Sequence, residues 1–331
     1  MEVVHTVQAY PAAAMYMVAL NEAMKSAMEL IAPPSDPAVR QFQAARRAFR
    51  AEYVGNAATQ FQEYLLRCWE SYAPRDMSIV AFPYVTVVQS AGFGKSRLLR
   101  QLAEQTKSST YKEMKVLYTC IHAEHSPVGF PRATPALNEF FFFFNARMGI
   151  GHLAARLYAA YVYAIQYWDS VGDDWFTLFQ DDNDKGREVA KQLELWIPGS
   201  VLMDHHSTPA MMTAAGSGDS KRVLVLAVDE ARGLLCHERD REGENSFFFR
   251  LWCEALNLAN HTIAQQFHEN AGILAVFVDS PDSDIVNRTA PMDWDPRSKK
   301  RPARTKLLPP FVLTHTMDVH HTRQWLEYQA K

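Results

Sequence analysis

Five short stretches of the chain are dominated by apolar residues, and this pattern predicts β-strands. They are 85–88, 114–121, 223–228, 272–278 and 311–314. The stretch 223–228 is apolar at every position, which is typical of a central parallel strand that is buried on both faces. Helices are expected between the strands, so the predicted fold class is α/β, with a doubly wound and mostly parallel five-stranded sheet.

Apolar residues return at helical spacing before the first strand. Residues 41–72 carry an apolar side chain every three or four positions, which predicts amphipathic helix. A proline cluster at 33–37 separates this segment from an earlier helix. We therefore expect a helical N-terminal region over 1–78 that packs against the sheet, and a second domain over 79–331.

A long segment between the second and third predicted strands is interpreted as a helical insertion, at about 132–220. It contains five consecutive phenylalanines at 140–144. This run is too short to span a membrane and indicates a buried helix instead.

The loop after the first strand has the residues of a phosphate-binding P-loop. The segment 85–99 reads as a β-branched strand, a glycine-bearing loop and a helix that begins with Lys95 and Ser96. In such a loop, backbone N–H groups and a helix N-terminus face the anion. The lysine reaches the β- and γ-phosphates and the serine hydroxyl binds Mg²⁺. The candidate nucleotide-binding residues are Ser90, Ala91, Gly92, Phe93, Gly94, Lys95, Ser96 and Arg97.

One position departs from the Walker A pattern G-x-x-x-x-G-K-[ST]. Gln89 stands where the pattern has its first glycine. Gly92 and Gly94 still supply the flexible turn, so we interpret the loop as degenerate but usable. The alternative is a chance Gly-Lys-Ser at a surface turn.

Two acidic residues, Asp229 and Glu230, follow the apolar stretch 223–228. They would lie at the carboxyl edge of the sheet, where doubly wound folds bind ligands. In a Walker B arrangement Asp229 holds Mg²⁺ and Glu230 polarises the attacking water. The alternative is a strand followed by an acidic helix N-terminus. The presence of both motifs in the right order favours a P-loop nucleotide-binding fold.

The stretch 272–278 is expected to lie between the two Walker strands, in the strand order 5-1-4-3-2. Its polar end, Asp279 and Ser280, would then lie beside the γ-phosphate as a sensor-type group. On local chemistry alone, the same two residues fit a turn cap equally well. The candidates for an arginine that stabilises γ-phosphate charge are Arg132, Arg250 and Arg288, of which Arg288 is preferred.

Several segments together resemble a known family. They are 89–98, 126–134, 228–231, 275–280 and 308–313. In this combination the chain resembles, over about residues 80–320, the NTPase module of crinkler-type effector proteins, which are similar to STAND and AAA-like ATPases. The resemblance implies a P-loop NTPase fold that binds ATP and either hydrolyses it or responds to it as a switch.

Composition narrows the expected class of protein and its cellular location. The chain has 331 residues, is 48% hydrophobic and carries a net charge of −3, which is typical of a globular protein and gives no electrostatic support for nucleic-acid binding. Its four cysteines lack metal-ligand or C-x-x-C spacing, which favours a reducing compartment. Neither a signal peptide nor a membrane-spanning segment is apparent, so an intracellular location, cytoplasmic or nuclear, and no membrane partner are expected.

Two further patterns are interpreted as loop features. The histidine pairs at 205–206 and 320–321 have no matching metal ligands, and the basic cluster at 297–306 is accompanied by prolines and acidic residues. We therefore interpret both as solvated loop segments.

The function predicted from the sequence is Mg²⁺-dependent ATP binding by an ATPase or ATP-regulated switch, with a protein partner or self-association. In this scheme Ser96 and Asp229 hold the metal, Asp279 contacts the nucleotide, and catalysis falls to Lys95, Glu230 and Arg288. The alternative is a non-enzymatic protein-interaction module with a degenerate nucleotide site, which Gln89 favours.

Overall fold

The chain divides into two compact units in a computed structural model. The structure describes residues 37–72, 82–90, 94–106, 113–121, 131–142, 149–166, 168, 178–179, 184–195, 197, 222–235, 247–279 and 308–312. One unit comprises Met1–Ala51 and Ser126–Phe130, and the other comprises Glu52–His125 and Pro131–Lys331. The described helix of the first unit is α3 (Pro37–Arg50).

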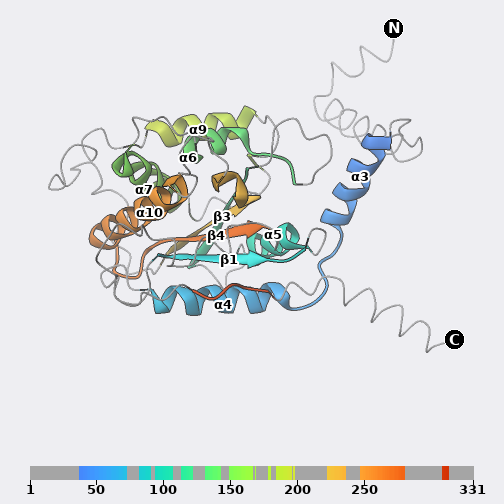
Figure 1. Ribbon diagram of the computed structural model, residues 1–331, viewed down its shortest axis with the longest axis horizontal. Coiled ribbons are helices and arrows are strands. Elements are labelled where there is room, and N and C mark those ends of the chain that lie inside the picture. Colours follow the sequence, from blue (N-terminus) through green and yellow to red (C-terminus); the bar gives the residue numbers. More distant parts are fainter. Residues whose placement is uncertain are drawn as a thin grey trace, which may run out of the picture. The chain divides into compact units, whose positions relative to one another are not determined.

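The second unit is built around a parallel sheet. Its strands are β1 (Tyr84–Val88), β2 (Met114–Cys120), β3 (Val223–Asp229) and β4 (Gly272–Asp279). They lie in the order β1-β4-β3-β2, and every pairing is parallel (Figure 1). All residues of β3 and β4 are buried, because each of these strands has a neighbour on both sides. The predicted α/β class and the position of β4 between the two motif-bearing strands are confirmed.

The predicted fifth strand is reduced to a single bridge in the described residues. Phe311 pairs with Val87 in the parallel sense. The Phe311 N–H donates to the Thr86 carbonyl at 2.8 Å, and the Phe311 carbonyl accepts the Val88 N–H at 3.3 Å. Two prolines immediately precede Phe311, and proline has no N–H to extend a ladder. The sheet therefore has four strands over the described residues, and not the five that the sequence predicted.

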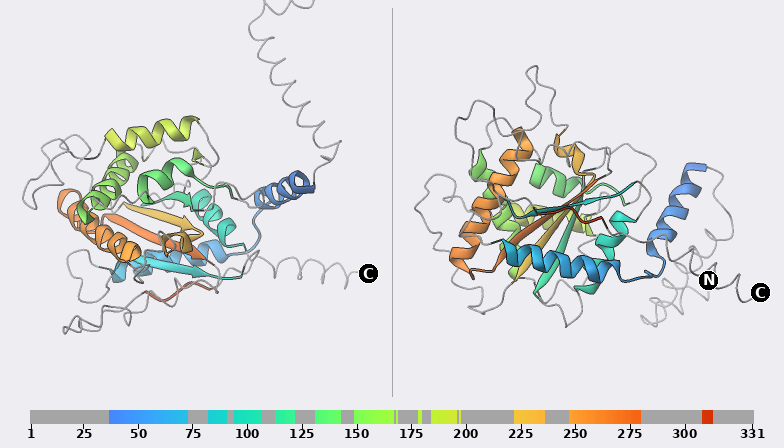
Figure 2. Two further views of the ribbon diagram at one scale, coloured as in Figure 1. Left: turned by 45° about the horizontal axis from the view of Figure 1, so that its top comes forward. Right: turned by 60° about the horizontal axis from the view of Figure 1, so that its bottom comes forward.

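Helices cover both faces of the sheet (Figures 1 and 2). One face is covered by α6 (Pro135–Phe142), α7 (Ile150–Gln166) and α10 (Phe247–Gln266), which share one apolar core with the strands. A further helix, α9 (Asp184–Leu195), contacts α6 and α7. On the opposite side, α4 (Ala57–Ser71) packs against α5 (Lys95–Gln105). None of the described helices is long and apolar enough to cross a membrane.

The segment 41–72 forms two helices where the apolar spacing indicated one helical stretch. Between α3 and α4, Gly55 has a φ of 105°, a backbone conformation that favours glycine. Of the two helices, α4 packs against the helix α5 of the sheet-containing unit. Its Trp69 indole N–H donates to the Asn270 carbonyl at 2.9 Å, and a Cβ on Gly272, the first residue of β4, would meet the Trp69 ring at 2.7 Å. This contact leaves no room for a side chain at Gly272.

Candidate functional site

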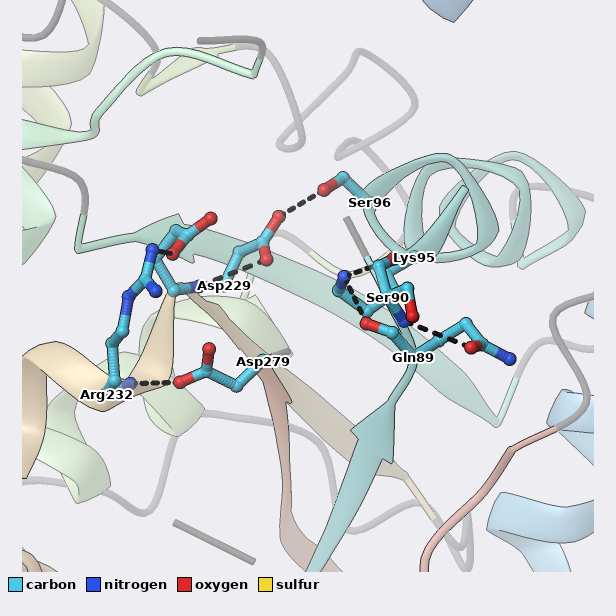
Figure 3. A network of polar contacts seen from close by, with 8 residues as sticks. Gln89, Ser90, Lys95, Ser96, Asp229, Arg232 and Asp279 are labelled. Atoms are coloured by element: carbon cyan, nitrogen blue, oxygen red, sulfur yellow. Dashed lines mark hydrogen bonds and ion pairs between the residues drawn. The ribbon is translucent and has the colours of Figure 1, made fainter. Parts of the chain in front are cut away.

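Polar residues gather where the parallel strands end. The β1 strand leads into Gln89 and Ser90, β3 ends at Asp229, and β4 ends at Asp279. Because the strands are parallel, these ends lie at one edge of the sheet, where open α/β folds bind ligands. Figure 3 shows Asp229 pointing toward Ser96 at the start of α5, whereas Asp279 points toward Arg232.

The first turn of α5 has no side-chain cap. Its N-cap residue is Gly94, with a φ of 80° that a side chain would disfavour. The Leu98 N–H donates to the Gly94 carbonyl at 2.8 Å, and the first turn carries no acidic residue. The Lys95 and Ser96 N–H groups thus belong to a first turn without a side-chain cap, at the positive end of the helix dipole, which is an arrangement that suits an anion.

Lys95 folds back onto the end of β1. Its ammonium donates to the Gln89 carbonyl at 2.6 Å and to the Ser90 carbonyl at 3.0 Å. Burial lowers the pKa of Lys95, while the nearby carboxylates of Asp229, Glu230 and Asp279 oppose that shift. The half-buried cation thus lies within electrostatic range of three acids contributed by two different strand ends.

The Asp229 carboxylate accepts hydrogen bonds from three donors. Its Oδ2 accepts a 2.5 Å hydrogen bond from the Ser96 hydroxyl and a 2.9 Å bond from the Tyr118 hydroxyl. Its Oδ1 accepts the Glu230 N–H at 3.0 Å. With 4% of its surface exposed, the carboxyl has a pKa raised by burial, and the two hydroxyl donors oppose that rise. These donors fix the carboxylate beside the first turn of α5.

The turn after β3 has an unusual backbone conformation. Glu230 has a φ of 54° and is the one non-glycine residue with a positive φ in the part of the chain that the structure describes. Such a conformation costs about 1–2 kcal/mol for a residue with a side chain. A 2.6 Å bond from the Arg232 N–H to Asp279 Oδ2 holds the turn. The Glu230 Oε2 atom also lies 2.6 Å from the Arg232 guanidinium, in an ion pair that is partly exposed. Backbone strain of this kind tends to occur at functional sites.

The Gln89 side chain does not lie between Ser96 and Asp229. Its φ is not positive, so its backbone does not need the glycine of the Walker pattern. The side-chain amide lies 3.4 Å from the Val312 carbonyl, to which it donates, and its oxygen accepts the Ser90 N–H at 3.0 Å. As Figure 3 shows, it points away from Ser96 and Asp229.

The structure brings together seven of the residues proposed from the sequence, which are Ser90, Gly94, Lys95, Ser96, Asp229, Glu230 and Asp279. The Arg97 side chain points elsewhere: it bonds the Glu52 carbonyl and lies 5.6 Å from the Tyr53 ring centroid. Three predicted loop residues, Ala91, Gly92 and Phe93, and the preferred arginine, Arg288, lie outside the described residues.

Two side chains at the site were missed by the sequence reasoning. Tyr118 lies in β2, and its contact with Asp229 depends on β2 pairing with β3, which no local pattern encodes. Arg232 did carry a signal, because it follows the Asp-Glu pair by only two positions. The sequence reasoning considered Arg132, Arg250 and Arg288 instead.

Metal binding by several acidic or thiol ligands is not indicated: over the described ranges, no group of three or more His, Cys, Asp or Glu side chains could hold an ion. A Mg²⁺ ion that is bound with a nucleotide needs fewer protein ligands, because it keeps several waters and takes only one or two oxygens from the protein besides the phosphate oxygens. The Ser96 hydroxyl and the Asp229 carboxylate, which lie 2.5 Å apart, fit that smaller requirement.

Fold and site together define an α/β protein whose parallel sheet carries a Gly-Lys-Ser helix start next to a buried aspartate. Residues 54–313 match the family described as "Domain of unknown function (DUF8735)", and the chain belongs to that family. No curated protein and no solved structure matches the chain.

Proposed function

We propose that the protein is a Mg²⁺-dependent ATP-binding P-loop NTPase that acts as an ATPase or as an ATP-regulated switch of the crinkler and STAND-like type. The observation that carries the proposal is the hydrogen bond between Ser96 and Asp229. These residues are 133 positions apart in the chain. In P-loop NTPases, the Walker A serine and the Walker B aspartate lie next to each other in the same way, because both hold the Mg²⁺ ion.

The sheet topology supports the same proposal. The strand before the loop, β1, and the strand that ends at Asp229, β3, are separated by β4. The Phe311 bridge lies on the outer side of β1. An extension of that bridge into a strand would give the order 5-1-4-3-2, which was expected from the sequence.

Each residue of the site has a definite task in this proposal. Ser96 and Asp229 hold the metal, which neutralises phosphate charge when it is bound. Lys95 exchanges its two carbonyl partners for phosphate oxygens, and the uncapped amides of α5 donate to the same group. Glu230 accepts a proton from the attacking water. The protein contributes positioning and charge neutralisation rather than covalent chemistry.

The second candidate is an interaction module that binds nucleotide weakly and does not hydrolyse it. One observation favours it: the Lys95 ammonium is already satisfied by the Gln89 and Ser90 carbonyls. Nucleotide binding must break both bonds, which reduces the net gain from the phosphate contact. The affinity for Mg-ATP, measured together with turnover under saturating Mg-ATP, separates the two candidates, because the interaction module is expected to bind weakly and to show no turnover.

The test of nucleotide binding is a titration of Lys95→Ala with Mg-ATP. The substitution removes the half-buried cation of the loop, so affinity is expected to fall by at least about tenfold, as for loss of a charge-assisted phosphate contact. Lys191→Ala is the matched control, because Lys191 is an exposed lysine on α9. It should bind Mg-ATP like the wild type.

Thermal unfolding of the same variants checks the fold. The hydrogen bonds lost in Lys95→Ala involve carbonyls at the end of β1 that water is able to solvate, so the melting temperature should change by only a few degrees. Unchanged ATP affinity in a folded Lys95→Ala protein would refute the P-loop proposal.

A further inference from the structure

Arg232 is the second cation among the carboxylates at the sheet edge. Its charge acts on Lys95 together with the charges of Asp229, Glu230 and Asp279. Over the described residues, these four side chains act on the charge of the Lys95 ammonium. Arg232 therefore belongs to the electrostatic environment in which a phosphate group would be bound.

The backbone of Arg232 is anchored, but its side chain is not buried. The Arg232 N–H donates to Asp279 Oδ2 at 2.6 Å, and Asp279 itself is buried at 3% exposure. The guanidinium pairs with Glu230 Oε2 at 2.6 Å, with side-chain exposures of 55% for Arg232 and 36% for Glu230. An ion pair as exposed as this one contributes little to stability and is readily exchanged.

The charge balance of the site favours such an exchange. Three carboxylates face two cations, and a nucleoside triphosphate brings further negative charge to the same place. The guanidinium has five N–H donors in a planar fork that matches phosphate oxygens in a bidentate way, and its bond to Glu230 uses one nitrogen. A phosphate group next to Glu230 is therefore a stronger partner for Arg232 than a single carboxylate oxygen.

We propose that Arg232 recognises the terminal phosphate of the nucleotide, and that its ion pair with Glu230 is the nucleotide-free arrangement of the site. This inference rests on the proposed function. Transfer of the guanidinium from Glu230 to the γ-phosphate releases the Glu230 carboxylate for the attacking water. Arg232 is thus the residue by which the site distinguishes a nucleoside triphosphate from a diphosphate.

The experiment compares the affinity for ADP with that for the non-hydrolysable β,γ-imido analogue of ATP, both with Mg²⁺. Arg232→Ala is expected to lower the preference for the triphosphate by on the order of tenfold, while ADP affinity stays the same, because only the γ-phosphate contact is lost. Arg232→Lys keeps the charge without the fork and should lose less. Arg187→Ala, which breaks an exposed ion pair on α9, should match the wild type.

Three outcomes would overturn the inference. An unchanged preference in Arg232→Ala would show that the guanidinium does not contact the γ-phosphate. Equal losses for both ligands would mean that Arg232 merely holds the turn after β3. A wild-type protein that binds ADP but shows no preference for the triphosphate would exclude γ-phosphate recognition while leaving nucleotide binding intact. If the wild type binds neither ligand, the proposed function fails, and this inference fails with it.

Discussion

Tyr118→Phe tests whether the buried Asp229 carboxylate is held as an ionised group. Tyr118 is fully buried, and its hydroxyl donates to Asp229 Oδ2 at 2.9 Å. Phenylalanine keeps the ring and removes the donor. A hydrogen bond to a charged group contributes about 1.5–3 kcal/mol, against about 0.5–1.5 kcal/mol for a neutral pair. We therefore expect Tyr118→Phe to lower the free energy of unfolding at neutral pH by about 2 kcal/mol.

Tyr161→Phe is the matched control for this substitution. Tyr161 is 1% exposed, and its hydroxyl donates to a neutral acceptor, the Arg222 carbonyl, at 3.1 Å. Its loss should cost only about 0.5–1.5 kcal/mol. Denaturant titrations followed by circular dichroism give both values, since a change in midpoint at constant slope reports a change in stability.

The pH dependence of the difference follows from the Asp229 titration. Burial raises the pKa of Asp229 above its ordinary value, while the Ser96 and Tyr118 hydroxyls oppose that rise. Because the folded-state pKa lies above the unfolded value, the stability linked to Asp229 is complete below the unfolded pKa of about 4 and is lost as pH rises through the folded one. Removing the Tyr118 donor raises the folded-state pKa further, so the loss in Tyr118→Phe should grow with increasing pH.

A pH series that starts near the unfolded pKa of about 4 and continues upward therefore distinguishes a bond to a carboxylic acid from a bond to a carboxylate. The Tyr161→Phe loss should be the same throughout the series, since its acceptor does not titrate. A Tyr118→Phe loss that is independent of pH and equal to that of Tyr161→Phe would refute the reasoning.

Two further substitutions separate the roles of the remaining site residues. Glu230→Gln should retain Mg-ATP binding and lose hydrolysis by about 10²–10⁴-fold, as expected for removal of a general base; equal phosphate release by variant and wild type would exclude Glu230 from that role. Gln89→Gly should leave nucleotide affinity unchanged or improved, because the Gln89 side chain is directed toward Ser90 and Val312. Thermal unfolding of this variant should show a destabilisation of about 1 kcal/mol, because glycine gives the unfolded chain more backbone freedom. A large loss of affinity in Gln89→Gly would identify Gln89 as a residue that contacts the nucleotide.

The four main strands could be predicted from the sequence because each is a short, dense apolar run. The run 223–228 signalled a buried central strand through composition alone, and β3 covers Val223–Asp229. Phe248 and Phe249, which belong to another dense apolar run, are likewise buried in α10. Strand order was predicted only through the P-loop interpretation, since neighbouring strands leave no mark in local sequence.

The fifth strand and the finer contacts of the site could not be predicted in the same way. Phe311 and its neighbours have strand composition, but Pro309 and Pro310 limit pairing in a way that apolar patterning ignores. The left-handed conformation of Glu230 could not be predicted from residue propensity, because glutamate rarely adopts a positive φ. The bond from the Arg232 N–H to Asp279 depends on β3 and β4 being neighbours in the sheet.

The central claim, that Lys95, Ser96 and Asp229 form a Mg-nucleotide site, is tested most directly by calorimetric titration of the wild-type protein. ATP and GTP would each be titrated with Mg²⁺ and again with a chelator in its place. The account predicts saturable binding of ATP that weakens when Mg²⁺ is removed, because Ser96 and Asp229 then face the phosphates without the ion between them. Absence of binding under all four conditions, or affinity that is indifferent to Mg²⁺, would contradict it.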